Sequence, residues 1–447
     1  MTDKTLSRRS FLLSSGLGFV AGSALTAAAI GFDVVPLGGT QATESVDSPW
    51  WVIGLSADPL MDERLLYKLG QIWYRMGDVG EILDTASRIE ASQPASWRAE
   101  WYHTADRLRA MADDSLASGH RISAGEAYLR AASYYLAGLI YNESPNDPDL
   151  LRASRASAET FAAALDLLDM PAQPVQIPYE GTHLPGYFFR VPGAQNAPIL
   201  IAHQGMDASI EEALFLGTEA VRRGYHALLF HHPGQGRALR ELGLTFRPDW
   251  ENVITPVVDF ALEQPGVDAD RIIVTGLSFG GSLVTRAAAF EKRIAILIPN
   301  PAHYDWYGFI RETMEEGIPN AGELAENAPR AFNTAVNAYL QAAPAFHSWW
   351  FRAAMWKFGA DSPAQLMANL KGYTNADIAG QVSCKVLVMA GEAETYGADY
   401  GTQLYDALTT DKDRIVFTAA DTALLHNQNG ALSVSAHYMY NWLDENI

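Results

Sequence analysis

The chain has little cysteine and few basic residues. Its 447 residues contain one cysteine, Cys384, which excludes an internal disulfide and any zinc site built from cysteines. Lys and Arg number 32 against 52 Asp and Glu, so the formal net charge is −20. A chain this acidic repels nucleic acids and anionic lipids, and we expect neither as a partner. Cys384 lies in an apolar run, and we interpret it as a core residue.

A long uncharged segment occurs near the N-terminus, from Ser10 to Phe32. It follows Arg8 and Arg9 and is rich in Gly, Ala and Ser, so it is only mildly hydrophobic. This arrangement resembles a twin-arginine export signal. We therefore expect residues 1–32 to direct export to the periplasm or the cell exterior, with no stable membrane span after processing. An uncleaved membrane anchor is the alternative, because the segment is just long enough to span.

The rest of the chain divides by its apolar pattern. Residues 33–61 read as a linker, and residues 62–170 carry apolar side chains at helical spacing, which predicts an N-terminal helical cap domain of four or five helices. Residues 171–447 alternate apolar strands with helices. This pattern predicts an α/β fold with a mostly parallel, doubly wound sheet and an antiparallel hairpin at its edge. A helical insertion at about 300–379 is interpreted as a lid over one end of the sheet.

The motif Gly-Leu-Ser-Phe-Gly at residues 276–280 follows a predicted strand and precedes a predicted helix. In that setting G-x-S-x-G forms a sharp turn that lifts the serine hydroxyl above the sheet. The free N–H groups at the start of the next helix favour developing negative charge. We therefore predict that Ser278 is a catalytic nucleophile.

A serine nucleophile needs a base, and the base needs an acid that orients it. In this fold the chain order is serine, acid, histidine, with both partners in loops after later strands. His426 follows the last predicted strand and is the predicted base. Glu394, which follows the preceding strand, is the preferred acid, and Asp399 is the alternative.

The remaining predicted site residues lie in two regions. An oxyanion hole needs two N–H donors where charge develops. Phe279, next to the nucleophile, supplies one, and Gly205 or Met206, in the loop after an earlier strand, supplies the other. Aromatic residues of the predicted lid are candidates for lining a pocket for a small apolar or aromatic substrate; they include Tyr304, Trp306, Trp349 and Trp350.

The adjacent His231 and His232 raise the question of a metal site. Neighbouring residues on a strand point in opposite directions, and no third ligand follows at a suitable spacing. We interpret this segment as a loop of the pocket wall, and we expect neither a metal nor another cofactor.

From about Gly119 to its end, the sequence resembles the α/β-hydrolases grouped with FrsA-like esterases and 2,6-dihydroxypseudooxynicotine hydrolase. The segments that carry the resemblance are SAGEAYLRAASYY, PYEGTHLPGYFF, QGMDASIEE, HHPGQG, GLSFGG and LLHNQNG. The chain departs from the family pattern at three places: Gln204-Gly205 replaces paired glycines, His231-His232 stands where many relatives have Asp, and Glu394 replaces the usual Asp.

The resemblance implies two reactions on one Ser-His-acid triad: hydrolysis of an ester, or of a carbon–carbon bond beside a ketone, each through an acyl-enzyme. The sequence leaves both open. A peptidase of the prolyl-oligopeptidase type and a non-catalytic binding protein on a hydrolase scaffold are the alternatives. The expected partner is a small-molecule substrate. The oligomeric state is undetermined, with a homodimer left open.

Overall fold

The structure is a computed structural model that describes residues 51–343 and 345–447, without the side chains of Ala345, Ala398 and Asp399. The predicted export segment at 1–32 and most of the predicted linker lie outside the described residues. Among the described helices, none is long and apolar enough to cross a membrane.

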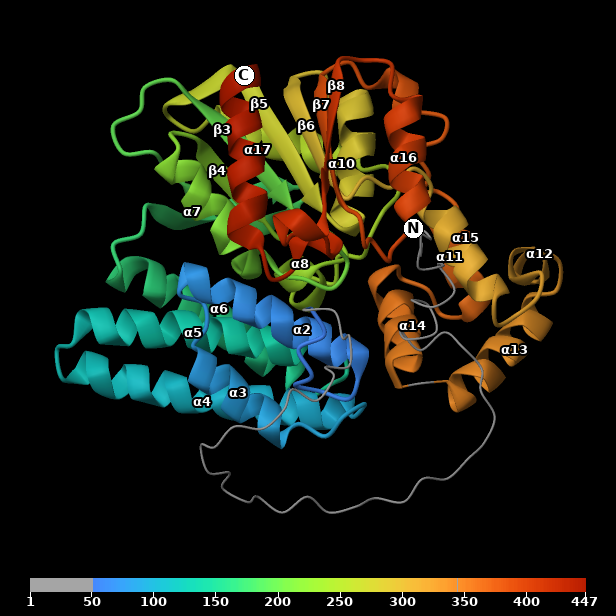
Figure 1. Ribbon diagram of the computed structural model, residues 1–447, viewed down its shortest axis with the longest axis horizontal. Helices are drawn as coiled ribbons and strands as arrows, with labels where there is room; N and C mark the ends of the chain where they lie inside the picture. Colours follow the sequence, from blue (N-terminus) through green and yellow to red (C-terminus); the bar gives the residue numbers. More distant parts are fainter. Residues whose placement is uncertain (1–50, 344) are drawn as a thin grey trace, which may run out of the picture.

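An N-terminal helical domain precedes the sheet and lies along one end of it (Figure 1). Its helices are α2 (Pro59–Gly70), η1 (Gln71–Tyr74), α3 (Val79–Arg88), α4 (Pro94–Ala117), α5 (Arg121–Leu139) and α6 (Leu150–Leu167). The first begins where the Asp58 side chain accepts hydrogen bonds from Leu60 N and Met61 N, with Pro59 at the first turn. Buried aromatic residues fill the core of this domain, including Trp97, Trp101 and Tyr134.

An eight-stranded sheet forms the second part of the molecule, in the order β1-β2-β4-β3-β5-β6-β7-β8. Its strands are β1 (Ala172–Tyr179), β2 (Thr182–Phe189), β3 (Ala197–His203), β4 (His226–Phe230), β5 (Val267–Leu277), β6 (Ile294–Asn300), β7 (Lys385–Gly391) and β8 (Lys412–Phe417). β1 and β2 form an antiparallel hairpin at one edge, and the strands from β4 to β8 run parallel. The predicted α/β class with an edge hairpin is confirmed.

Helices cover both faces of this sheet because each central strand is apolar on both sides. Along β3, Ile199 and Ile201 pack in one cluster with α9 (Glu251–Leu262) and α10 (Phe279–Phe290). Leu200 and Ala202 face the opposite way and pack with α7 (Leu214–Arg222) and α17 (Leu432–Asn446). The remaining helices of this part are η2 (Ile210–Ala213), α8 (Gly236–Arg240), α16 (Ala398–Ala407), η4 (Ala419–Asp421) and η5 (His426–Gln428).

A helical insertion separates β6 from β7 and lies beside the N-terminal domain (Figure 1). It contains α11 (Trp306–Glu315), α12 (Ala321–Asn327), α13 (Pro329–Ala342), α14 (Ala345–Lys357), α15 (Pro363–Leu370) and η3 (Ala379–Gln381). Trp349 of α14 meets Tyr141, which follows α5, with ring centroids 4.9 Å apart. The insertion is therefore joined to the helical domain by a buried aromatic contact.

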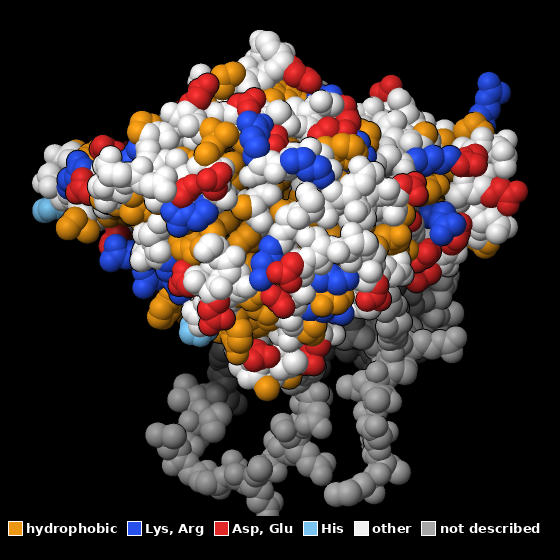
Figure 2. Space-filling model, turned by 90° about the horizontal axis from the view of Figure 1, so that it is seen from above, with side chains coloured by type: hydrophobic (Ala, Val, Ile, Leu, Met, Phe, Trp, Pro, Cys, Tyr) orange, Lys and Arg blue, Asp and Glu red, His pale blue; other side chains and the backbone are white. Residues whose placement is uncertain are grey.

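The surface carries acidic and basic side chains intermixed over the face shown in Figure 2, without a block of one sign. The net charge of −20 is therefore spread over the surface rather than gathered into one acidic tail on this face.

Candidate active site

The candidate nucleophile, Ser278, lies between the end of β5 and the first residue of α10. Its backbone has φ 56° and ψ −130°, a conformation that residues with a side chain rarely adopt. Two neighbouring chain segments hold this turn in place. The Ser278 backbone N–H donates to Asn300 O at 2.8 Å and to Asn427 Oδ1 at 2.9 Å. The side chain is only partly buried.

The glycines of the motif are required by close packing at the turn. A Cβ at Gly276 would lie 2.3 Å from the Gly280 carbonyl oxygen, and one at Gly280 would lie 2.8 Å from the Gln204 carbonyl oxygen. Both distances are too short for real carbon–oxygen contacts. The G-x-S-x-G spacing thus allows β3, β5 and α10 to meet directly beneath the serine.

The candidate base and acid contact each other. His426 Nδ1 lies 2.8 and 2.9 Å from the two carboxylate oxygens of Glu394, so the ring N–H donates to the carboxylate. Tyr396 N donates to the same carboxylate at 2.8 Å. Burial alone would raise the pKa of Glu394, but the adjacent His426 and these hydrogen bonds outweigh it, and the pKa lies below its ordinary value of 4.5. Glu394 is therefore ionised at neutral pH and holds the His426 ring by Nδ1.

The histidine loop and the serine turn lie side by side. Asn427, the residue after His426, accepts the Ser278 N–H. Behind it, the carboxamides of Gln428 and Asn300 are paired through two hydrogen bonds of 2.7 and 3.1 Å. Within the described residues there is no direct hydrogen bond between the Ser278 hydroxyl and the His426 ring. Such contacts are often long in the absence of substrate.

Asn300, Asn427 and Gln428 are not among the site residues predicted from the sequence. The polar run HNQNG that begins at His426 is the only signal for the last two. Nothing in the sequence around Asn300 indicates that it pairs with a residue 128 positions later.

The candidate oxyanion loop approaches the serine closely. A Cβ added to Gly205 would lie 2.7 Å from Ser278 Cβ and 3.2 Å from its Oγ. Gln235 Nε2 holds the Gly205 carbonyl at 3.0 Å, so the peptide is fixed from behind. In the part of the chain that the structure describes, the N–H groups of Gly205 and Met206 donate to no protein acceptor. Phe279 is the first residue of α10, where a helix leaves its N–H free.

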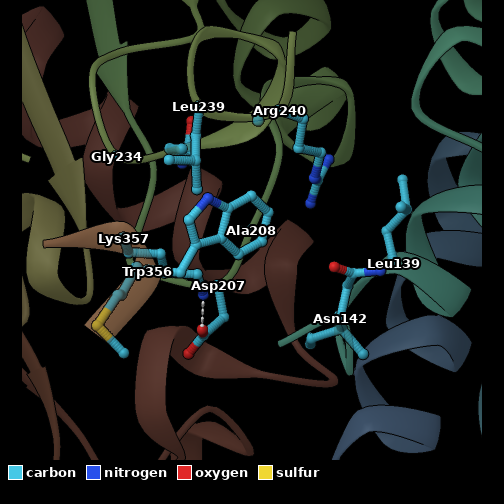
Figure 3. A pocket seen from close by; sticks show the side chains of 13 residues that line it. Leu139, Asn142, Asp207, Ala208, Gly234, Leu239, Arg240, Trp356 and Lys357 are labelled. Atoms are coloured by element: carbon cyan, nitrogen blue, oxygen red, sulfur yellow. Dashed lines mark hydrogen bonds and ion pairs between the residues drawn. The ribbon is translucent and has the colours of Figure 1, made fainter. Parts of the chain in front are cut away.

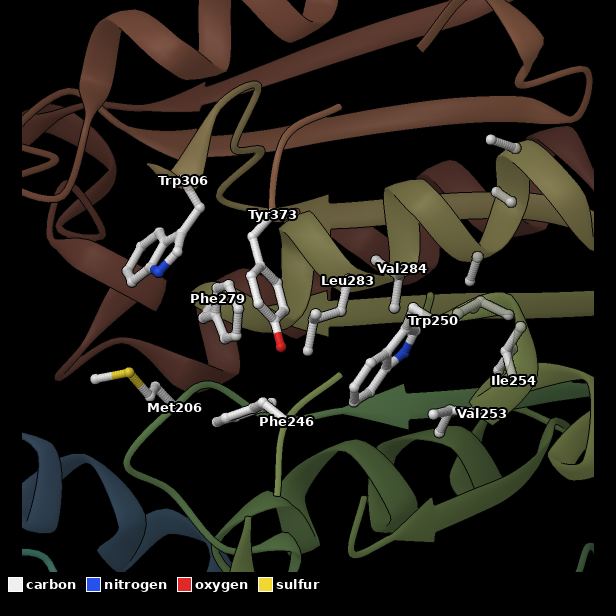
Figure 4. Packing of buried hydrophobic residues seen from close by; sticks show 14 of the residues in the cluster. Met206, Phe246, Trp250, Val253, Ile254, Phe279, Leu283, Val284, Trp306 and Tyr373 are labelled. Carbon is white, nitrogen blue, oxygen red and sulfur yellow. The ribbon is translucent and has the colours of Figure 1, made fainter. Parts of the chain in front are cut away.

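The aromatic residues predicted to line a pocket separate into two places. Trp306 is buried beside Phe279, with ring centroids 4.7 Å apart, in the apolar cluster shown in Figure 4. Tyr304 is partly buried in the same cluster. Trp349 is buried against Tyr141 of the helical domain, and Trp350 is partly buried between the two clusters. The side chain of Asp399, the alternative acid, lies outside the described residues.

The two adjacent histidines have separate partners. His231 Nε2 lies 3.1 Å from Glu211 Oε1, and the His232 ring contacts the carbonyl oxygens of Pro233 and Gln204. Over residues 51–343 and 345–447, no group of three or more His, Cys, Asp or Glu side chains is arranged to hold a metal ion.

Curated relatives of the chain are fungal hydrolases, although no protein-family profile matches it. The chain is 31% identical over 408 residues to 20-hydroxy-prefusarin hydrolase FUS2 of Gibberella moniliformis, covering 87% of this chain and 96% of the relative. It is also 31% identical over 421 residues to the alpha/beta hydrolase psoB of Aspergillus fumigatus, covering 88% of this chain and 94% of that one. Both alignments extend further towards the N-terminus than the resemblance seen from Gly119 onwards.

A solved structure has the same fold. The crystal structure of 2,6-dihydroxy-pseudo-oxynicotine hydrolase superposes with a TM-score of 0.65 and 18% identity, over 84% of this chain and 95% of that one. The similarity in structure and the similarity to the fungal proteins each extend over both the helical domain and the sheet. The chain therefore belongs to the α/β-hydrolase family and is a hydrolase related to the fungal proteins FUS2 and psoB.

Proposed function

We propose that this protein is a serine hydrolase that cleaves an acyl bond in a small organic substrate through an acyl-enzyme. Ser278 is the nucleophile, His426 the base and Glu394 the acid that orients it. The observation that carries the proposal is the buried contact of 2.8 Å between His426 and Glu394, in a loop whose next residue contacts the Ser278 turn.

In this mechanism the Ser278 oxygen attacks the substrate carbonyl while its proton passes to His426 Nε2. Glu394 accepts a hydrogen bond from Nδ1 and stabilises the imidazolium that forms. The N–H groups of Phe279 and of Gly205 or Met206 stabilise the negative oxygen of the tetrahedral intermediate. The intermediate collapses as the leaving group departs with a proton from His426. Water then attacks the acyl-enzyme by the same sequence and releases the acid.

The leaving group is an alcohol in ester hydrolysis and a carbanion in carbon–carbon hydrolysis. The carbanion route requires a leaving carbon acidified by neighbouring carbonyls or by a phenol ring. The names of two relatives, a prefusarin hydrolase and a pseudo-oxynicotine hydrolase, support a small functionalised organic substrate for this chain as well. Phe279, the residue after the serine, and Trp306, which packs against it, make the surroundings of the site apolar, which suits such a compound.

The test is the Ser278→Ala variant, assayed on aryl esters, acyl-phenols and β-diketones with products resolved by mass spectrometry. Removing the nucleophile is expected to lower kcat by about 10³-fold or more on every substrate that the parent protein cleaves. Ser282→Ala, one turn further along α10, is the matched control and is expected to retain activity. Undiminished turnover by Ser278→Ala would refute the proposal.

Two further measurements separate the alternatives. A fluorophosphonate that labels the parent protein but not Ser278→Ala supports an activated serine, whereas no labelling of either favours a binding protein. Faster cleavage of a dipeptide anilide than of an aryl ester favours a peptidase.

A further inference from the structure

A cavity lies where the oxyanion loop, the N-terminal helical domain and the lid insertion meet. Its empty volume is about 300 Å³, including space open to solvent. Figure 3 shows Asp207 and Lys357 on one side, Leu139 and Asn142 on the other, and Arg240 entering from above between them. Leu139 is at the end of α5, and Asn142 is in the segment after it. Without movement of its walls, the interior has room for only a water-sized group.

The cavity adjoins the candidate oxyanion hole. Gly205 touches Ser278, and the next residues, Met206 and Asp207, line the cavity. Gln235 also lines it and binds the Gly205 carbonyl. The cavity therefore begins one residue after Gly205 along the chain, although Ser278 and Gly205 themselves do not line it.

One cation in the cavity wall has no carboxylate in direct contact. Lys357 is paired with Asp207. Arg240 makes one hydrogen bond, to Ser209 Oγ at 3.1 Å, and within the described residues no carboxylate lies within 4 Å of it. By contrast Arg237, on the same short helix, is paired with Glu241 at 3.0 Å.

A second cation reinforces this charge from the helical domain. Arg64 of α2 has no hydrogen bond or ion pair to any described residue, and its Nε is buried. Burial lowers the pKa of Lys357, Asp207 opposes that shift, and the positive charges of Arg240 and Arg64 lower it further. Arg64 therefore adds positive charge to the surroundings of Lys357, although Glu63 and Asp207 offset it and Arg64 does not line the cavity.

Asn142 supplies a second, independent observation. Its side chain is 3% exposed, and neither its carboxamide oxygen nor its nitrogen has a hydrogen-bond partner in the structure. Gln235 Oε1, also buried in the cavity wall, is likewise without one. Buried amides are almost always hydrogen-bonded, so these groups indicate a polar occupant.

We propose that this cavity, once its walls move apart, binds an anionic oxygen group of the substrate, either a carboxylate or the enolate of a 1,3-dicarbonyl, through Arg240 and the Asn142 amide. The inference rests on the proposed acyl hydrolysis at Ser278. Both groups present two coplanar oxygens that share one negative charge, which is the geometry that the planar guanidinium fork matches. The substrate is then a small molecule that carries an acidic group beside the scissile carbonyl.

The experiment compares matched charged and neutral substrates. The carboxylate arm uses 4-nitrophenyl hemiesters of succinic, glutaric and adipic acids against the methyl esters of the same hemiesters. The enolate arm uses 2-acyl-cyclohexane-1,3-diones against their 2-methyl derivatives, which do not form the enolate. The measured quantity is the ratio of kcat/KM for the charged substrate to that for its neutral partner.

The parent protein is expected to favour the charged member of at least one arm. Arg240→Gln is expected to lower that ratio by about ten- to a hundred-fold, the range for a hydrogen bond to a charged group. Asn142→Asp, which adds a negative charge to the cavity, is also expected to lower the ratio. Arg240→Lys keeps the positive charge, and its ratio is expected to lie between those of Arg240→Gln and the parent protein. The matched control is Arg237→Gln, which is expected to leave the ratio unchanged.

The outcomes separate the two proposals. A ratio that Arg240→Gln does not change in either arm overturns the anion site, because comparing variant with parent cancels the different intrinsic reactivity of the charged and neutral substrates. If the neutral esters are still cleaved in a Ser278-dependent way, the proposed hydrolase stands. Thermal unfolding of each variant shows whether a loss of activity comes from misfolding. If Arg240→Gln is misfolded, the ratio of kcat/KM is compared instead between the parent protein, Arg240→Lys and Asn142→Asp.

Discussion

At the scale of single residues, Gly205 brings the backbone of the candidate oxyanion loop close to Ser278. A methyl group at this position would lie 2.7 Å from Ser278 Cβ, so either the serine or the oxyanion loop must move. We expect Gly205→Ala to lower kcat by about 10²-fold or more, comparable to the loss of one oxyanion donor, with a smaller effect on KM. Steady-state kinetics on an aryl ester measure this.

Gly380→Ala is the control for that substitution. A Cβ there has no atom within 4 Å, and the residue lies in η3, away from the candidate site. Activity should be unchanged in this control. If Gly205→Ala remained fully active, the loop would not be as close to the nucleophile as the structure indicates.

Residue types with a local signature could be predicted from the sequence, and those without one could not. Ser278 lies in the G-x-S-x-G motif. His426 and Glu394 each follow a predictable strand, in the chain order expected for a base and its acid, so the sequence predicts that these two side chains contact each other. Arg240 and Asn142 carry no such signature. The role proposed for them rests on the unpaired Asn142 amide and on the lack of a contacting carboxylate at Arg240 among the described residues. Both depend on how α8 and the segment after α5 are placed in three dimensions.

At the scale of elements, the same distinction applies. The eight strands could be predicted because short apolar, β-branched runs such as residues 271–277, bounded by turn residues, are typical of buried strands. The position of the helical insertion between β6 and β7 against the helical domain could not be predicted. It depends on the contact of Trp349 with Tyr141, two aromatic residues whose sequence contexts are equally consistent with a pocket or a core.

The ion pair that joins α2 to η2 gives a prediction at this scale. Lys68 Nζ lies 2.8 Å from Glu212 Oε1, and both side chains are less than a tenth exposed. Lys68→Met would leave the Glu212 carboxylate buried without its partner. Breaking such a pair costs about 3–5 kcal/mol, so we expect the free energy of unfolding in urea to fall by that amount.

Two further variants make the Lys68 result specific. Lys68→Met combined with Glu212→Gln removes both charges and is expected to recover part of the stability. Arg152→Met breaks exposed pairs with Asp106 and Asp149, each worth about 1 kcal/mol or less. If Lys68→Met cost no more than Arg152→Met, the pair would not hold the helical domain to the sheet.

At the scale of the whole molecule, buried histidines make stability depend on pH. His203, His232 and His303 are all 1% exposed or less. Burial lowers the pKa of His232 and of His303 to about 4, and it lowers that of His203 well below 6.5. These rings are therefore neutral in the folded protein at pH values where they bind protons in the unfolded chain.

The sign of the effect follows from the lowered pKa. Between pH 6.5 and about 4 the unfolded chain binds more protons, so stability is fully present above pH 6.5 and is lost as the pH falls. From pH 7 to pH 5 each histidine with a folded pKa of about 4 should cost about 2 kcal/mol of unfolding free energy. Glu394, whose pKa is lowered from 4.5, contributes mainly below this window.

His303→Phe isolates one such contribution. Both ring nitrogens of His303 are buried without hydrogen-bond partners, so a phenyl ring can replace the imidazole without leaving a new polar group unpaired. Urea unfolding at pH 7, 6 and 5 should show a loss of stability that is smaller in the variant by about 2 kcal/mol. An equal loss in the parent protein and in His303→Phe would mean that this ring is protonated in the folded state.

A charged ring there would also change the field at Glu394 and His426, which act electrostatically on His303. The pH dependence of folding and that of the proposed catalysis therefore involve the same part of the molecule.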